Sequence, residues 1–185
     1  MRVPALLALI VVATLPVAAA EKAGVTMPAQ ITVDGQTLVL NGMGLREVGW
    51  IDVYVAGLYL KSRSSDGEAI AGSNETRRIR MEFVRGVSRK KLVKAWDEGF
   101  EANAGSDLKA LTDRIATFNG WMVDVEKRDT ITLTYRAGTG TEVEVKGRNA
   151  GTIEGDDFAR ALFLIWLGAD PPTAELRDGM LGLEE

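Results

Sequence analysis

The chain has 185 residues, of which 46% are hydrophobic and 26% are charged, so it is long and apolar enough for one globular domain with a buried core. It contains no cysteine and no histidine, which excludes disulfides, thiol nucleophiles, histidine-held metals and imidazole catalysis. Its net charge of −4 gives no general attraction to phosphates, so no nucleic-acid partner is expected.

Residues 1–20 have the pattern of a secretory signal peptide. Arg2 precedes an apolar stretch, a run of three alanines ending at Ala20 offers a cleavage site, and charged residues follow at once. A membrane anchor is the alternative, but the apolar run is short and is interrupted by Pro16. We therefore expect cleavage after Ala20, a mature domain over residues 21–185, and a periplasmic or secreted location.

The first half of this domain is rich in predicted strands. Residues 31–40 contain two β-prone runs, separated by the turn signal Asp34-Gly35. A glycine-rich passage follows, and residues 50–60 then carry the strongest β signal in the chain, with apolar side chains on both faces. We expect residues 50–60 to form a central strand that is covered on both sides.

Three further strands are predicted from alternating apolar and polar residues, over residues 77–84, 130–136 and 141–147. Such alternation is typical of an antiparallel sheet with one face toward water. Between the first and second of these strands, apolar residues recur at helical spacing. Ser88 and Ser106 are suitable N-caps, so two helices are expected there.

Two more helices are predicted at the C-terminal end. The first begins at Asp156 or Asp157 and carries so little charge that it must be buried nearly all round. A short final helix is expected from about Thr173 to Leu181. The order β-β-β-β-α-α-β-β-α-α predicts an α+β fold, in which the helices pack on one face of the sheet.

The glycine-rich passage, residues 41–49, contains the first candidate site residue, Arg46. A phosphate-binding loop is disfavoured because a strand, and not a helix, follows the glycines. A bulged or bent β segment is expected instead. If strand alternation continues through the glycines, Arg46, Asp52 and Tyr54 project from one face. Arg46 then either pairs with Asp52 or, beside the phenol of Tyr54, receives a carboxylate, enolate or phenolate ligand.

A basic segment from Arg77 to Lys94 contains eight arginines and lysines and a single acidic residue, Glu82. Two interpretations are open. The charges either form a solvated surface, or they receive an anionic head group or the surface of an acidic membrane.

The passage LNGMGLREVGWIDVYVAGLYL, residues 40–60, resembles the chalcone isomerase superfamily, in which a Gly-x-Gly-x-Arg motif leads into a strand that ends Gly-hydrophobic-Tyr-Leu. The passage TIEGDDFARALFLIWLG, residues 152–168, and the order of elements between them are also similar. The resemblance covers residues 25–182 and is greatest to bacterial chalcone isomerase-like proteins with export signals. It implies an open-faced β-sandwich, with a large antiparallel sheet, helices over one face, and a cleft between them.

The resemblance also implies what has changed in the site. In the plant enzymes an arginine, a threonine and a tyrosine assist the addition of a phenolate to an enone. Arg46 matches the arginine, but Tyr54 stands at the threonine position. Arg89 and Lys90 occur where the tyrosine is expected. Because each donor of such a network is worth on the order of a hundredfold in rate, losing two predicts that isomerase activity is lost or very slow.

Other branches of the superfamily hold a fatty acid with an arginine and a tyrosine near the carboxylate. We therefore expect a non-catalytic exported protein that binds a small amphipathic carboxylate or aromatic ligand, without a cofactor or metal. The alternatives are an isomerase that uses Arg46, and a partner-binding accessory protein without a small ligand. The expected ligand-binding residues are Arg46, Tyr54, Leu58, Arg89, Lys90, Trp96 and Phe100, with Phe163 and Trp166 as further candidates for the apolar wall.

Overall fold

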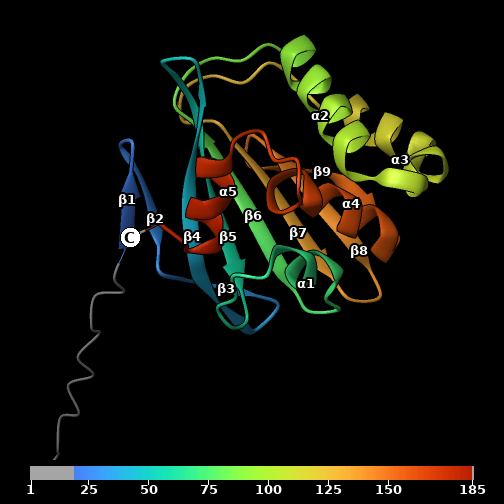
Figure 1. Cartoon of the computed structure of the whole chain (residues 1–185), viewed down its shortest axis with the longest axis horizontal. Coiled ribbons are helices and arrows are strands. Elements are labelled where there is room, and N and C mark those ends of the chain that lie inside the picture. The colour runs from blue at the N-terminus through green and yellow to red at the C-terminus, as the bar shows by residue number, and fades with distance from the viewer. Residues whose placement is uncertain (1–18, 185) are drawn as a thin grey trace, which may run out of the picture.

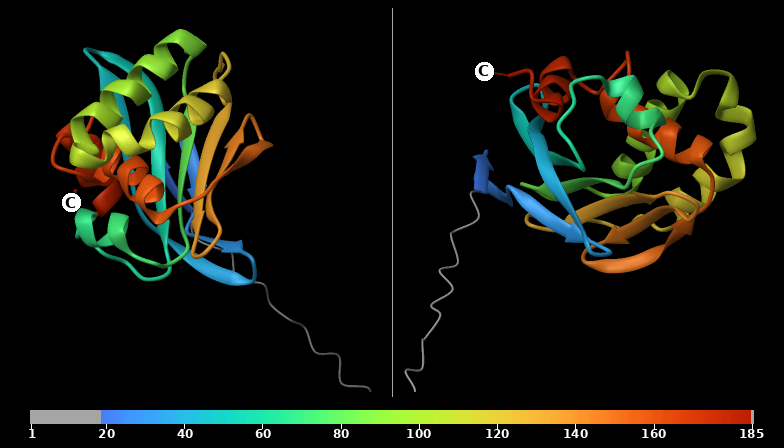
Figure 2. Two further views of the ribbon diagram at one scale, coloured as in Figure 1. Left: turned by 90° about the vertical axis from the view of Figure 1, so that its right-hand side faces the viewer. Right: turned by 90° about the horizontal axis from the view of Figure 1, so that it is seen from below.

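The computed structural model describes residues 19–184 and shows a curved antiparallel sheet with helices on one face (Figures 1 and 2). This is the predicted α+β class and the open-faced β-sandwich that the resemblance implied. Most of the predicted signal peptide, residues 1–18, lies outside the described residues. Within residues 19–184, no helix combines the length and the apolar character needed to cross a membrane.

The sheet is a meander of seven strands, in which each strand pairs antiparallel with the next along the chain. The central strand β5 is buried from Tyr54 to Leu60 and packs against apolar side chains on both faces, as predicted. The strands, in order across the sheet, are β3 (Gln30–Val33), β4 (Gln36–Val48), β5 (Ile51–Leu60), β6 (Arg77–Phe83), β7 (Thr130–Arg136), β8 (Gly140–Val145) and β9 (Arg148–Ile153).

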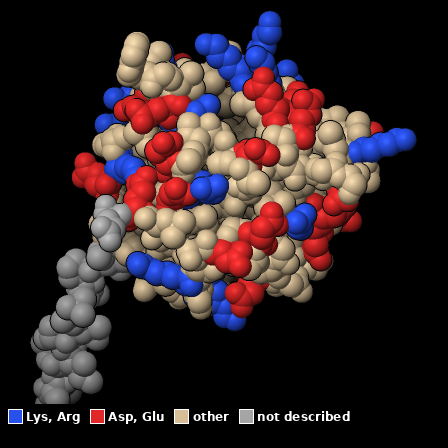
Figure 3. Space-filling model, viewed as in Figure 1, with Lys and Arg blue, Asp and Glu red and all other residues tan. Residues whose placement is uncertain are grey.

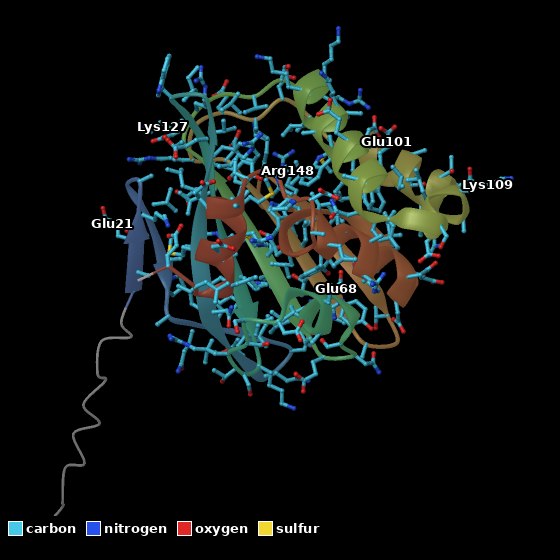
Figure 4. All side chains as sticks on the ribbon, in the orientation of Figure 1. Glu21, Glu68, Glu101, Lys109, Lys127 and Arg148 are labelled. Atoms are coloured by element: carbon cyan, nitrogen blue, oxygen red, sulfur yellow. The ribbon has the colours of Figure 1, made fainter. Side chains whose placement is uncertain are left out.

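The helices cover one face of this sheet and enclose the main core (Figure 2). The helix α4 is buried on nearly all sides, as its lack of charge predicted. On the outer side of the helical layer, Glu101 and Lys109 point into solvent (Figure 4). The helices are α1 (Gly67–Gly72), α2 (Arg89–Asn103), α3 (Leu108–Gly120), α4 (Asp156–Leu167) and α5 (Ala174–Leu181).

A second, smaller core lies on the other face of the sheet, beneath a hairpin of β1 (Ala19–Lys22) and β2 (Val25–Pro28). Val25 and Met27 of the hairpin pack there with Val55 and Tyr59 of β5. Lys22 forms an ion pair with Glu184, which holds the C-terminal end of the chain beside β1 (Figure 1).

The glycine-rich passage is part of β4, which runs unbroken to Val48 with bulges after Leu40 and after Arg46. The expected bulged β segment is therefore confirmed. Its glycines allow α5 to approach the strand closely. A Cβ at Gly44 would clash with the backbone carbonyl of Leu176. A Cβ at Gly42 would meet the same helix one turn later.

Several elements differ from the sequence-based expectation. The short helix α1, the edge strand β9 and the hairpin β1–β2 were not predicted. Their buried residues are too few to establish a period, since α1 buries only Gly67, Ile70 and Ala71. The helix expected from Ser106 begins instead at Leu108, because residues 105–107 form a 3₁₀ turn ahead of it.

Candidate functional site

A cavity of about 630 Å³ lies between the sheet and the helices, at the end of the sheet where β4 turns into β5. Strands β4, β5 and β6 contribute one wall. Helices α2 and α4 and the segment after α4 contribute the other. The volume falls within the range of about 300–1,000 Å³ that is usual for sites of small organic ligands. The fold therefore contains the cleft between sheet and helices that the family resemblance implied.

The floor of the cavity is apolar and aromatic. Trp96 and Trp166 pack edge to face with ring centroids 5.4 Å apart, and Tyr54 packs in the same way on Phe83 at 5.6 Å. The alternation of β6 and the helical spacing of α2 bring these side chains together. The buried lining residues are Tyr54, Met81, Phe83, Leu92, Trp96, Ile165 and Trp166.

Arg46 and Tyr54 are the central polar residues of the cavity. They are direct cross-strand partners on β4 and β5, so both side chains project from the same face of the sheet. Arg46 is half-buried and donates a hydrogen bond to the carbonyl of Glu47, at 2.5 Å. The alternative of an ion pair with Asp52 is not realised within residues 19–184. The bulge after Arg46 places Asp52 opposite Glu47 at the exposed end of the hairpin.

The hydroxyl of Tyr54 is arranged to donate a hydrogen bond into the cavity. It accepts a hydrogen bond from Trp166 Nε1 at 3.1 Å, and within residues 19–184 its own proton has no acceptor. Burial raises the pKa of Tyr54 to about 12, although the hydrogen bond from Trp166 and the charge of Arg46 both lower it. The phenol is therefore protonated at neutral pH and available to an anion.

A second buried donor lies in the floor. Trp96 is 4% exposed, and its Nε1 has no hydrogen-bond partner among the described residues. Buried donors are normally satisfied, so an unpaired indole N–H in a cavity wall marks a position that favours an acceptor atom. Apart from the phenol and the two indoles, the floor consists of hydrocarbon and a thioether.

The rim nearest the β4–β5 turn is positively charged. Arg85, from the connection between β6 and α2, and Lys91, in the first turn of α2, line it together with Arg46. None of the three forms an ion pair within residues 19–184. Two carboxylates also line the cavity. Glu98 lies about 10 Å farther along α2 and pairs with Lys94 at 3.3 Å, and Asp170 lies in the segment after α4.

Of the predicted site residues, Arg46, Tyr54 and Trp96 line the cavity, as does Trp166 from the wider set. The structure places Leu58 and Phe100 elsewhere, in the fully buried core. Leu58 lies toward the C-terminal end of β5, away from the cavity at the β4–β5 turn. Phe100 faces Phe118 and Phe158 at the α2–α3–α4 contact, because it lies on the α2 face turned toward those helices.

The two predicted basic residues at the start of α2 also lie outside the lining. The guanidinium of Arg89 donates to the carbonyls of Met122 and Asn119, at 2.9 and 3.2 Å, and so stabilises the C-terminal end of α3. Lys90 is exposed to solvent. The adjacent Lys91 reaches the rim instead. The sequence alone did not show which of these neighbouring residues faces the cavity.

The basic segment is not one surface. Arg77 is buried with its guanidinium between the rings of Tyr135 and Phe163, at 4.1 and 4.6 Å, which also removes Phe163 from the candidate wall. Arg78 donates to Thr134 at 2.8 Å, and Arg80 pairs with Glu82 at 3.0 Å. The part of the segment from Arg85 onward remains at the cavity end.

Several lining residues were missed by the sequence analysis, among them Arg85, Lys91 and Phe83. Phe83 carried a signal, since it ends the apolar face of β6. Arg85 and Lys91 lay within the basic segment, but only the structure separates them from its paired members.

The chain has three tyrosines, and Tyr54 is the one that lines the cavity. No threonine is among the described lining residues.

Comparisons with known proteins agree with this description of the fold. The sequence profile of the chalcone isomerase-like family matches residues 19–182. A search of curated proteins found no match. Among solved structures, the chain is similar to the fatty-acid binding protein AtFAP1 of Arabidopsis thaliana, with a TM-score of 0.70 and 19% sequence identity over 89% of this chain and 96% of that one.

Proposed function

The chain belongs to the chalcone isomerase-like family, and from that premise we propose that it is a non-catalytic binding protein for a fatty acid or another small amphipathic or aromatic carboxylate. One observation carries the proposal. Arg46 and Tyr54 lie side by side on the wall of an apolar cavity, and neither engages a carboxylate within residues 19–184.

The polar and the apolar parts of the cavity would bind different parts of the ligand. A carboxylate accepts charge-assisted hydrogen bonds from the guanidinium of Arg46 and a hydrogen bond from the protonated phenol of Tyr54. The hydrocarbon then lies along Phe83, Trp96 and Trp166, where each buried methylene contributes about 0.8 kcal/mol. Arg85 and Lys91 add positive potential at the rim, which favours the entry of an anion.

The lining supports binding over ring closure. The resemblance implies that the related enzymes use an arginine, a threonine and a tyrosine to stabilise the enolate, and only the arginine is matched here: Tyr54 stands at the threonine position, and no second tyrosine is among the described lining residues. The raised pKa of Tyr54 also makes it a poor base near neutral pH. We expect chalcone-type substrates to react no faster in the presence of the protein than in buffer.

We also propose that the protein is exported and that its mature domain is residues 21–185. The support is the signal-peptide pattern in the sequence. N-terminal sequencing of the exported chain tests this, because it should begin at Glu21, whereas a chain that keeps residues 1–20 contradicts the proposal.

The binding proposal is tested by comparing laurate with dodecanol, which has the same chain without the charge. Arg46→Met should weaken laurate binding roughly ten- to hundredfold, since a hydrogen bond to a charged group contributes about 1.5–3 kcal/mol. Dodecanol binding should change little. Isothermal titration calorimetry measures both affinities.

The matched control is Arg148→Met, because Arg148 is exposed and lies outside the cavity lining. This variant should bind both ligands like the unmodified chain. Equal losses for acid and alcohol in Arg46→Met, or undiminished laurate binding, would overturn the assignment of Arg46 as the carboxylate-binding residue.

A further inference from the structure

The turn between β4 and β5 is the most exposed apolar feature of the described chain. Trp50 is fully exposed, at 100%, and its neighbours Val48 and Ile51 are 55% and 47% exposed. The turn is tight, because β4 ends at Val48 and β5 begins at Ile51. A tryptophan contributes the most stability when its ring is buried, so a fully exposed one has no structural explanation within the fold.

This turn stands at the entrance of the cavity. Val48 and Ile51 line its rim, while Trp50 itself is not part of the lining and projects beyond it. In Figure 1 the β4–β5 turn extends past the other strands at the upper end of the sheet. A ligand that enters at this end of the cavity passes the turn.

Positive charge lies next to the exposed turn. Arg85 and Lys91 are on the same rim, and Lys90 is exposed beside them. Figure 3 shows Lys and Arg side chains along the upper edge of the molecule. Three carboxylates oppose this charge: Glu47 and Asp52 flank the turn, and Asp124 accepts a hydrogen bond from the backbone N–H of Arg89 at 2.6 Å. The attraction to an anionic surface therefore comes from Arg85, Lys90 and Lys91, none of which forms an ion pair within residues 19–184.

We propose that this end of the molecule docks on an anionic lipid bilayer, with Trp50 inserted among the head groups and Arg85, Lys90 and Lys91 against the lipid phosphates. Exposed tryptophan beside lysine and arginine is the combination that interfacial membrane segments use. In this orientation the entrance of the cavity faces the membrane. An amphipathic ligand can then move between the bilayer and the cavity without crossing water. This last step rests on the proposed function, whereas the docking does not.

Flotation with lipid vesicles tests the docking on the ligand-free chain. The unmodified protein should float with vesicles of equal parts phosphatidylglycerol and phosphatidylcholine, and binding should fall at least tenfold with phosphatidylcholine alone or in high salt. Trp50→Ala should reduce binding to the anionic vesicles at least tenfold. Leu183→Ala is the matched control, because Leu183 is 55% exposed and lies outside the cavity lining.

The outcomes separate the two proposals. Trp50→Ala should keep the laurate affinity of the unmodified chain when no vesicles are present, because Trp50 does not line the cavity. If laurate does not bind, the proposed function fails while the docking still stands on the flotation result. Docking is overturned if the unmodified chain does not float, or if Trp50→Ala floats equally well. It is also overturned if Trp50→Ala instead abolishes a dimer in sedimentation velocity, which would make the turn a self-association surface.

Discussion

Arg46 and Tyr54 have different environments, and each environment suits the part proposed for it in binding an anion. The guanidinium of Arg46 is half-buried, so it keeps partial contact with water while unliganded. Tyr54 is 9% exposed and its hydroxyl accepts a hydrogen bond from Trp166, so its orientation is fixed before a ligand arrives. A fixed donor beside a charged one lowers the ordering cost of binding.

The protonation of Tyr54 makes a prediction about stability at high pH. Tyrosine in an unfolded chain has a pKa near 10, and the folded pKa of Tyr54 is about 12. Between these values the unfolded chain loses the proton while the folded chain retains it. The stabilisation is therefore complete below pH 10 and is lost as the pH rises toward 12.

We expect the free energy of unfolding of the unmodified chain to fall by about 2 kcal/mol more than that of Tyr54→Phe between pH 9 and pH 12. Urea denaturation at a series of pH values measures the difference. The lysines and the other tyrosines titrate in both proteins, so their contributions cancel in the difference between the two pH profiles. Parallel pH profiles for the two proteins would show that Tyr54 is not buried as described.

Among the residues proposed from sequence, Arg46 and Tyr54, which belong to one local motif, lie on the cavity wall. Arg46 and Tyr54 were found because Gly-x-Gly-x-Arg and the following strand are contiguous in sequence. Lys91 was missed in favour of Arg89 and Lys90, because rotation about a helix axis depends on tertiary packing. The guanidinium of Arg89 is drawn to the end of α3 by carbonyls that no sequence pattern connects to it.

Among the elements, α5 and β4 form the contact that gives the glycines of the motif their structural role. Gly44 leaves space for the backbone carbonyl of Leu176, so the helix lies directly on the strand that carries Arg46. A side chain at this position must push the helix away, because backbone atoms on both sides cannot rotate aside.

Gly44→Ala should therefore lower the free energy of unfolding by about 1–3 kcal/mol, the usual cost of overpacking. Chemical denaturation measures this. Gly120→Ala is the control: no atom lies near its Cβ position, and alanine favours the helix it ends, so stability should stay equal or rise slightly. Equal stabilities for Gly44→Ala and the unmodified chain would contradict the close approach of α5.

The elements with a clear pattern of hydrophobic residues were predicted well, and those without one were not. Strand β6 and helix α4 were predicted well, because alternation or continuous burial extends through each of them. The edge strand β9 was not predicted, since it buries only Ile153 and pairs on one side.

In the molecule as a whole, the two faces of the sheet differ: one is covered by the β1–β2 hairpin, and the other forms the cavity with the helices. The face away from the helices is closed by β1–β2 over Val55 and Tyr59, which stabilises the sheet without contributing to the cavity. The helical face packs tightly around α4 but leaves the space beneath the start of α2 unfilled. The sequence predicted this layering from the order of elements, but the location of the unfilled volume depends on the tertiary packing of α2, α4 and the sheet.

The most direct test of the central claim is a crystal structure of the chain with laurate. We expect the carboxylate oxygens within hydrogen-bond distance of the Arg46 guanidinium and the Tyr54 hydroxyl, with the hydrocarbon against Phe83, Trp96 and Trp166. Laurate bound with its carboxylate away from Arg46, or a cavity that stays empty at saturating laurate, would contradict the account.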